Sequence, residues 1–88
     1  MSEKRYTVEI QSRAEKSLRS LPKAAATRLR QVIDALADEP RPHGYLKMKG
    51  FENQYRVRDG NYRIIYSIFD DKLVVEVINV GPRKDIYR

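Results

Sequence analysis

The tripeptide Asp59-Gly60-Asn61 constrains the fold more than any other feature of this sequence. It separates residues 54–58 from residues 62–69, two runs with the length and side-chain types of β-strands. Asp-Gly between two such runs is a strong signal for a two-residue hairpin turn, because both residues tolerate positive φ. We therefore predict an antiparallel hairpin with Asp59 and Gly60 in its turn.

Further strands are expected on both sides of this hairpin. Residues 73–80 form a third strand-like run after the polar break at residues 70–72, so this half of the chain predicts a three-stranded antiparallel meander. Near the N-terminus, Tyr6, Val8 and Ile10 alternate with polar residues, as in a short strand with one buried face.

Two helices are predicted between the first strand and the meander. Ser12 and Glu15 have the spacing of a capping box, in which the hydroxyl accepts the Glu15 N–H and the carboxylate reaches back. Pro22 suits the first turn of a second helix, because its missing N–H is not needed there, and Pro40 ends that helix. The apolar residues fall on one face of each helix: Ala14, Leu18 and Leu21, then Ala25, Leu29, Val32, Ile33 and Leu36.

This order of elements defines an α+β fold. The tight Leu21-Pro22 corner implies an antiparallel helical hairpin, and residues 41–53, which proline and glycine interrupt, are expected to be a connecting loop. We expect one domain over residues 1–88, with an N-terminal strand, the two-helix hairpin and the meander, and with the helices packed on one face of the sheet.

Composition narrows the chemistry and the partners. The 88 residues carry 18 Lys and Arg against 12 Asp and Glu, a net charge of +6, and no cysteine. A disulfide scaffold, a thiolate zinc site and a cysteine nucleophile are therefore excluded. No apolar run reaches the roughly 20 residues of a membrane span, and no signal-peptide core is visible, so we expect a cytoplasmic domain with no membrane contact. Such a basic domain typically binds nucleic acid or an acidic protein, although the charge also fits a solvated surface.

Three arginines are predicted to share one face of the hairpin. With the predicted turn, Arg56 lies opposite Arg63, and Arg58 lies opposite Asn61. The arginines then point to one face, and the apolar residues of both strands point to the other. Like charges opposite each other destabilise a sheet unless an anion lies between them, which favours an anion-binding face over arginines that simply extend into water. A three-residue turn would shift the register by one residue and scatter the cluster.

Other polar residues are given structural roles. His43 lies in a Pro- and Gly-rich loop and is expected at the surface, and Asp70 and Asp71 are expected in a turn rather than at a metal site. No constellation of carboxylates points to a metal ion or cofactor. Four tyrosines at strand spacing are expected to pack in the core rather than stack on bases: Tyr6, Tyr55, Tyr62 and Tyr66.

Two segments of the chain resemble the RelE family within the RelE/ParE toxin superfamily. They are YRVRDGNYRIIY at residues 55–66 and VGPRKDIYR at residues 80–88. The spacing of the apolar residues in the first strand and helix, the Leu21-Pro22 corner and residues 46–50 also fit, so the resemblance covers nearly the whole chain. Pro82 departs from it, because many relatives have a histidine or another polar residue there. The chain also ends at Arg88 without the C-terminal helix of some relatives.

The resemblance implies a compact α+β toxin that acts on translation. Members similar to RelE enter the ribosomal A site and cleave messenger RNA there, and each is paired with an antitoxin. It therefore implies a RelB-like antitoxin, the ribosome and mRNA as partners, with operator DNA bound only by the toxin–antitoxin complex. Two other functions stay open: a ParE-like toxin that inhibits DNA gyrase without being an enzyme, and a nucleic-acid-binding module without turnover.

The resemblance also implies which residues form the site. By motif position the catalytic candidates are Arg56, Arg58, Arg63, Arg83 and Tyr87, and the further substrate-binding candidates are Lys47, Lys49, Lys84 and Arg88. RNA cleavage by its own 2′-hydroxyl needs a base, and arginine does not deprotonate at neutral pH, whereas nearby cations lower the pKa of a tyrosine. Tyr87 is thus the candidate base, and Arg63 or Arg83 the group that stabilises the phosphorane. The general acid is not assigned, and the ribosome is an alternative source of part of this geometry.

Overall fold

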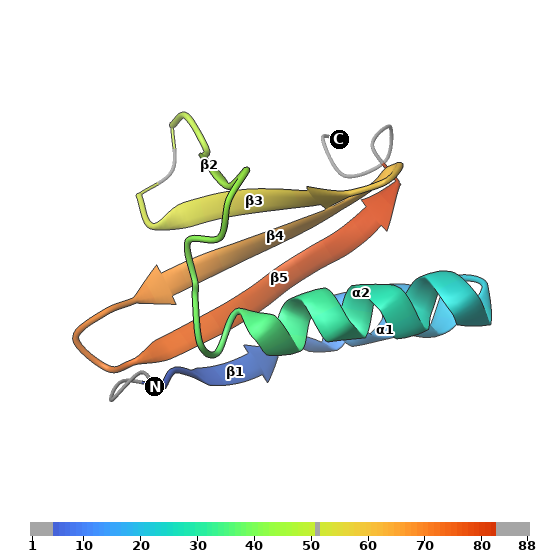
Figure 1. The fold of residues 1–88 in the computed structure, drawn as a ribbon, viewed down its shortest axis with the longest axis horizontal. Coiled ribbons are helices and arrows are strands. Elements are labelled where there is room, and N and C mark those ends of the chain that lie inside the picture. Colours follow the sequence, from blue (N-terminus) through green and yellow to red (C-terminus); the bar gives the residue numbers. More distant parts are fainter. Residues whose placement is uncertain (1–4, 51, 83–88) are drawn as a thin grey trace.

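The computed structural model describes residues 5–50 and 52–82, which form an α+β fold with a mixed sheet (Figure 1). The elements are β1 (Thr7–Ile10), α1 (Ser12–Ser20), α2 (Lys23–Ala35), β2 (Leu46–Lys47), β3 (Gln54–Asp59), β4 (Tyr62–Phe69) and β5 (Val74–Pro82). The five strands lie in the order β1-β5-β4-β3-β2. Only β1 runs parallel to its neighbour, β5, and the other pairs are antiparallel. The predicted α+β class, helix pair and meander are confirmed.

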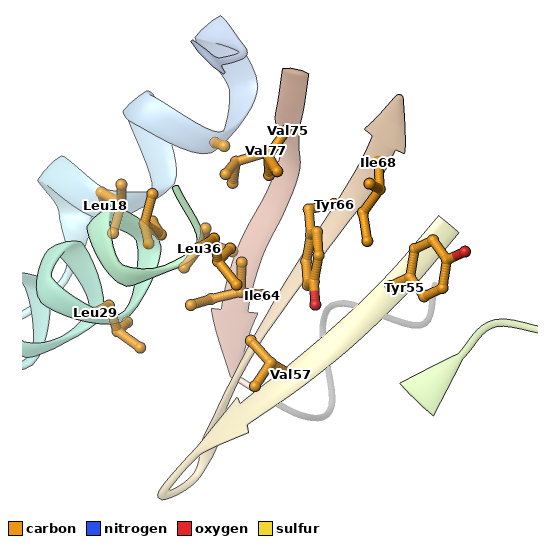
Figure 2. Packing of buried hydrophobic residues seen from close by; sticks show 13 residues of the cluster. Leu18, Leu29, Leu36, Tyr55, Val57, Ile64, Tyr66, Ile68, Val75 and Val77 are labelled. Atoms are coloured by element: carbon orange, nitrogen blue, oxygen red, sulfur yellow. The ribbon is translucent and has the colours of Figure 1, made fainter. Parts of the chain in front are cut away.

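The core lies between the two helices and one face of the sheet. Leu18 and Leu29 point from the helices toward β4 and β5, where Ile64 and Val77 are also fully buried (Figure 2). The predicted helical stripe is confirmed, because the described helix residues at its spacing are the ones that pack inward. Farther from the helices, the rings of Tyr66 and Tyr55 continue the buried core on the same face of the sheet.

The hairpin register differs from the prediction. Asp59 pairs with Tyr62, so the two turn residues are Gly60 and Asn61 rather than Asp59 and Gly60. Gly60 has a φ of 61°, which suits the glycine that a type II′ turn places first. Asp59 stays in the strand, where its carboxylate is bound by the Arg28 side chain of α2. The predicted pairing of Arg56 with Arg63 is therefore wrong, and the predicted pairing of Arg58 with Asn61 is wrong as well.

The predicted capping box is also wrong. The N-cap of α1 is Gln11, whose carbonyl accepts the Glu15 N–H at 2.9 Å, and Gln11 makes no side-chain cap. The Glu15 carboxylate accepts hydrogen bonds from Arg30 at 2.6 Å and from Arg19 at 3.2 Å, so it joins the two helices instead of reaching back. At the next corner, Pro22 is the N-cap of α2 and lies just before the helix.

The sheet contains one strand, β2, that was not predicted, and a longer β5 than predicted. The expected connecting loop contains β2, which pairs with β3 through two residues. β5 continues to Pro82, and a register shift between Ile65 and Tyr66 marks a bulge in its pairing with β4. Within residues 5–50 and 52–82, neither helix is long and apolar enough to cross a membrane.

Candidate basic site

The three hairpin arginines lie together on the sheet face that points away from the helices. Arg58 lies directly opposite Arg63, and Arg56 is two residues along the same strand, opposite Ile65. The apolar partners of these strands, such as Val57 and Ile64, are buried on the other face. The corrected register shifts the pairing by one residue on each strand, so the predicted face is kept although the opposed pair changes.

The three arginines differ in exposure. Arg58 is exposed, Arg56 is half-buried and Arg63 is only 3% exposed. A guanidinium stays charged when buried, so it must be paired to be tolerated there, and Arg63 and Arg56 both make interactions within the chain. Arg58 thus presents its charge to solvent, whereas Arg63 is a fixed charge set into the sheet. The sequence did not signal this difference.

The predicted substrate-binding lysines of the β2 region lie beside this face. Lys47 and Lys49 are exposed and line a hollow of about 350 Å³ together with Arg56. Strand pairing positions the hollow, because Leu46 lies opposite Arg56 on the neighbouring strand. The structure therefore brings together Lys47, Lys49 and Arg56, which are separated in sequence by the β2–β3 connection.

The last described strand, β5, ends beside the turn of the β3–β4 hairpin. Gly81 lies opposite Arg63, and Pro82 lies opposite Tyr62. The predicted end of this strand at Val80 was two residues too early, because Gly81 and Pro82 still pair with β4. The other predicted site residues, Arg83, Lys84, Tyr87 and Arg88, lie outside the described residues, and their roles stay predictions.

An ion pair that sequence reasoning missed holds the hairpin turn against α2. The Arg28 guanidinium donates to the Asp59 carboxylate, and this hydrogen bond raises the pKa of Arg28. A Cβ added at Gly60 would lie 3.3 Å from Arg28 Nη2, so the turn and the helix approach closely. The pair draws the Asp59 charge to the helix side, away from the arginine face. Thirty-one residues separate the partners, and no local pattern marks them.

Asp70 and Tyr66 take structural roles, as predicted, and His43 lies at the surface. His43 is exposed, and Asp70 lies in the β4–β5 turn, where it accepts hydrogen bonds from Arg41 at 2.9 Å and Tyr6 at 2.6 Å. Tyr66 is fully buried, and its hydroxyl donates to the Pro40 carbonyl at 2.7 Å. Burial raises the pKa of Tyr66. In the part of the chain that the structure describes, no three His, Cys, Asp or Glu side chains gather as a metal site would require.

Comparison with known proteins identifies the class of protein to which this chain belongs. Residues 8–87 match the family described as the ParE toxin of type II toxin–antitoxin systems, parDE. The mRNA interferase toxin RelE of Escherichia coli is 31% identical over 81 residues, which cover 90% of this chain and 84% of that protein. These matches define a small toxin of a type II toxin–antitoxin system.

Solved structures agree with this assignment. In the archaeal RelE–RelB complex from Pyrococcus horikoshii, the matching chain is 35% identical with a TM-score of 0.79, and the match covers 91% of this chain and 97% of that one. A chain of the toxin–antitoxin complex RelBE2 from Mycobacterium tuberculosis is 25% identical with a TM-score of 0.81, over 96% and 98% of the two chains. The protein belongs to the RelE family of the RelE/ParE superfamily.

Proposed function

We propose that this toxin is an mRNA endonuclease that acts on translating ribosomes and cleaves mRNA in the A site. The observation that carries the proposal is the pair of directly opposed arginines, Arg58 and Arg63, with Arg56 beside them on the helix-free face. Opposed cations destabilise a sheet, and a phosphate bound at the exposed Arg58 would offset the repulsion between it and the buried Arg63. The relatives named mRNA interferase support RNA as the source of that phosphate.

The proposed chemistry uses a nucleophile that the RNA itself supplies. The 2′-hydroxyl oxygen attacks the adjacent phosphorus, its proton passes to a base, and the bond from phosphorus to the 5′-oxygen breaks. The products are a 2′,3′-cyclic phosphate and a 5′-hydroxyl, which takes up one proton. The guanidiniums supply the positive charge that the dianionic transition state needs, so the scheme requires no metal ion.

Each candidate residue has a distinct part in this scheme. Tyr87 is the base, and Arg63 or Arg83 stabilises the phosphorane. Arg56 and Arg58 hold the substrate, and water bound to them carries the proton to the leaving oxygen. Lys47, Lys49, Lys84 and Arg88 bind neighbouring phosphates. The exposure of Arg58 and the burial of Arg63 support this division. A solvent-facing arginine can contact the substrate, and a buried arginine that is held in place provides a fixed positive charge near the reacting phosphate.

The proposal includes a partner that neutralises the toxin in the cytoplasm. We expect a RelB-like antitoxin whose acidic segment covers the arginine face, and operator DNA that binds only the complex. The support is the likeness to chains solved in RelE–RelB complexes. Expression of the toxin alone should arrest growth, and coexpression of its antitoxin should restore it. Harmless expression of the folded toxin without any antitoxin would contradict the toxin's proposed activity.

Primer extension on an mRNA held by programmed ribosomes tests the proposed function directly. The wild-type protein should produce a new 3′ boundary at the A-site codon, and Arg58→Ala should weaken it. Lys16→Ala, which removes an exposed cation of α1, is the control and should leave the boundary unchanged. Intact mRNA with the wild-type protein, under conditions where the ribosomes are occupied, would reject the proposal.

A second function is favoured by one specific observation, the match to a family described as ParE toxin. A toxin of that kind would inhibit DNA gyrase without cleaving RNA. A supercoiling assay separates the two functions: the proposed endonuclease should leave gyrase activity unchanged at concentrations that cut ribosome-bound mRNA. Inhibition of gyrase with intact mRNA would establish the alternative.

A further inference from the structure

Strand β2 and the residue after it place the exposed Leu46 and the half-buried Met48 next to the arginine face. β2 is the terminal strand of the described sheet, and Leu46, which is 52% exposed, lies directly opposite Arg56. The main-chain pairing continues beyond the strand, because the Met48 N–H donates to the Gln54 carbonyl at 2.8 Å. Side chains alternate along such a ladder, so Leu46 and Met48 project to the same face as Arg56.

These side chains line a hollow, here called the β2 pocket, that has an apolar wall and a cationic rim. Leu46 and Met48 form the wall with Arg56 on the same face, and Lys47 and Lys49, which alternate to the other face of the strand, complete the cationic rim at the edge of the sheet. Its volume is about 350 Å³, within the range of small-ligand sites. A single exposed leucine is ordinary on a protein surface. Here an apolar neighbour on the same face and three cations that line the same hollow set this leucine apart.

We infer that the β2 pocket binds one nucleotide of single-stranded RNA, with the nucleobase against Leu46 and Met48 and a phosphate among the cations. The inference rests on the proposed function and names a base-contacting subsite for it. A nucleotide has a flat face of low polarity and an anionic phosphate, which match the wall and the rim. An acidic peptide would match the rim, but its aliphatic side chains would not need a flat apolar wall.

The position of the pocket relates it to the proposed cleavage site. Across the sheet, β2 is followed by β3 with Arg56 and Arg58, and then by β4 with Arg63. An RNA strand that places a phosphate at the opposed arginines would therefore place a neighbouring nucleotide at β2. The wall offers apolar contact area rather than a pattern of donors and acceptors, so it should prefer purines, which have the larger face to cover it, over pyrimidines.

Methyl NMR of the isolated toxin tests this inference without the ribosome. The probe is a purine trinucleotide with a 2′-O-methyl group on every ribose, which blocks attack by the 2′-oxygen. A base against the wall should shift the Leu46 and Met48 methyl resonances through its ring current. An abasic trinucleotide with the same phosphates should leave those methyls nearly unshifted. Binding of the purine probe should weaken about fivefold in Leu46→Ala, because the truncation removes apolar area that the base would otherwise cover.

The matched control is Tyr45→Leu, one residue away. Tyr45 is 38% exposed and packs toward Tyr55 on the other side of the strand, with ring centroids 5.9 Å apart, so this variant should bind the probe like the wild type. Equal methyl shifts with the abasic probe, or no shift with either probe, would overturn the inference. Tighter occupation of these methyls by an acidic peptide of equal charge would assign the pocket to a protein instead. None of these outcomes depends on cleavage, so the proposed endonuclease activity stands or falls separately.

Discussion

Arg58 and Arg63 face each other across the central hairpin of the sheet, one exposed to solvent and the other only 3% exposed. Directly opposed like charges destabilise a β-ladder by about 0.2–1 kcal/mol. Arg63 makes interactions within the chain, whereas Arg58 presents its charge to solvent. Arg58 therefore relates the stability of the hairpin to the proposed function of the basic face, and the two effects can be measured separately.

Arg58→Gln should stabilise the protein while it weakens RNA binding. Removal of the exposed member relieves the repulsion, so the free energy of unfolding in urea should rise by about 0.2–1 kcal/mol. Arg13→Gln, which removes an exposed charge on α1, should change stability by less than that. A destabilised Arg58→Gln would show that Arg58 makes a net favourable contact in the free protein.

The arginine face shows how far the sequence alone could predict the site. Alternation along the strands was enough to put Arg56, Arg58 and Arg63 on one face, because alternation depends only on strand geometry. The pairing partner was wrong because Asp59-Gly60 and Gly60-Asn61 are both plausible turns. In the structure the turn is Gly60-Asn61, and Asp59, which stays in the strand, binds Arg28 of α2, a contact from a distant part of the chain that no local pattern marks.

The fold also has parts that local sequence patterns predict and parts that depend on distant contacts. The Leu29 and Ile33 stripe was predictable because helical periodicity is local. β2 was not, because its two residues have too little pattern to identify a strand. The role of Glu15 was missed for a similar reason, since its capping spacing is local while its partner, Arg30, belongs to the second helix.

Tyr66→Phe should destabilise the protein by about 1–3 kcal/mol. The substitution keeps the ring but removes the hydroxyl that donates to the Pro40 carbonyl at 2.7 Å, which leaves a buried acceptor without its donor. Tyr6→Phe is the matched control, because its hydroxyl contacts Asp70 at an exposed site where water can replace it. Equal losses in urea unfolding for the two variants would contradict this account of the buried bond.

Glu15 should make stability depend on pH in the acid range. The hydrogen bond from Arg30 holds the pKa of Glu15 below its ordinary value of 4.5. A carboxyl whose pKa is lowered in the folded state stabilises the fold fully above the unfolded value, and this stabilisation is lost as the pH falls below about 4.5. Glu15→Gln should therefore be less stable than the wild type at pH 7. The difference should shrink as the pH is lowered, and a constant difference in thermal unfolding would contradict the ion-pair explanation.

The cations around the β2 pocket should control the salt dependence of RNA binding. Each phosphate contact to single-stranded RNA contributes about 0.7 to the slope of log affinity against log salt concentration. Lys47→Ala and Lys49→Ala should each reduce that slope by about this amount. Lys16→Ala, an exposed lysine on α1, should leave it unchanged. A slope that is flat in the wild type would indicate binding without phosphate contacts.

Tyr87→Phe should separate chemistry from binding. The ring is kept, so affinity for the programmed ribosome should change little, while the single-turnover cleavage rate should fall by about 10²–10⁴, the usual contribution of a general base. Arg83→Ala should lower the rate by about 10²–10³ if it stabilises transition-state charge. Full activity in a Tyr87→Phe variant that circular dichroism shows to be folded would remove Tyr87 as the base.

Single-turnover cleavage of an mRNA with one 2′-deoxy nucleotide at the scissile position tests the central claim most directly. Because the proposed nucleophile is the 2′-hydroxyl, the wild-type toxin should cut the all-ribose mRNA on the ribosome and leave a 2′,3′-cyclic phosphate and a 5′-hydroxyl. The 2′-deoxy mRNA, bound to the same ribosomes, should stay intact. Cleavage of the 2′-deoxy mRNA at a comparable rate would contradict the account.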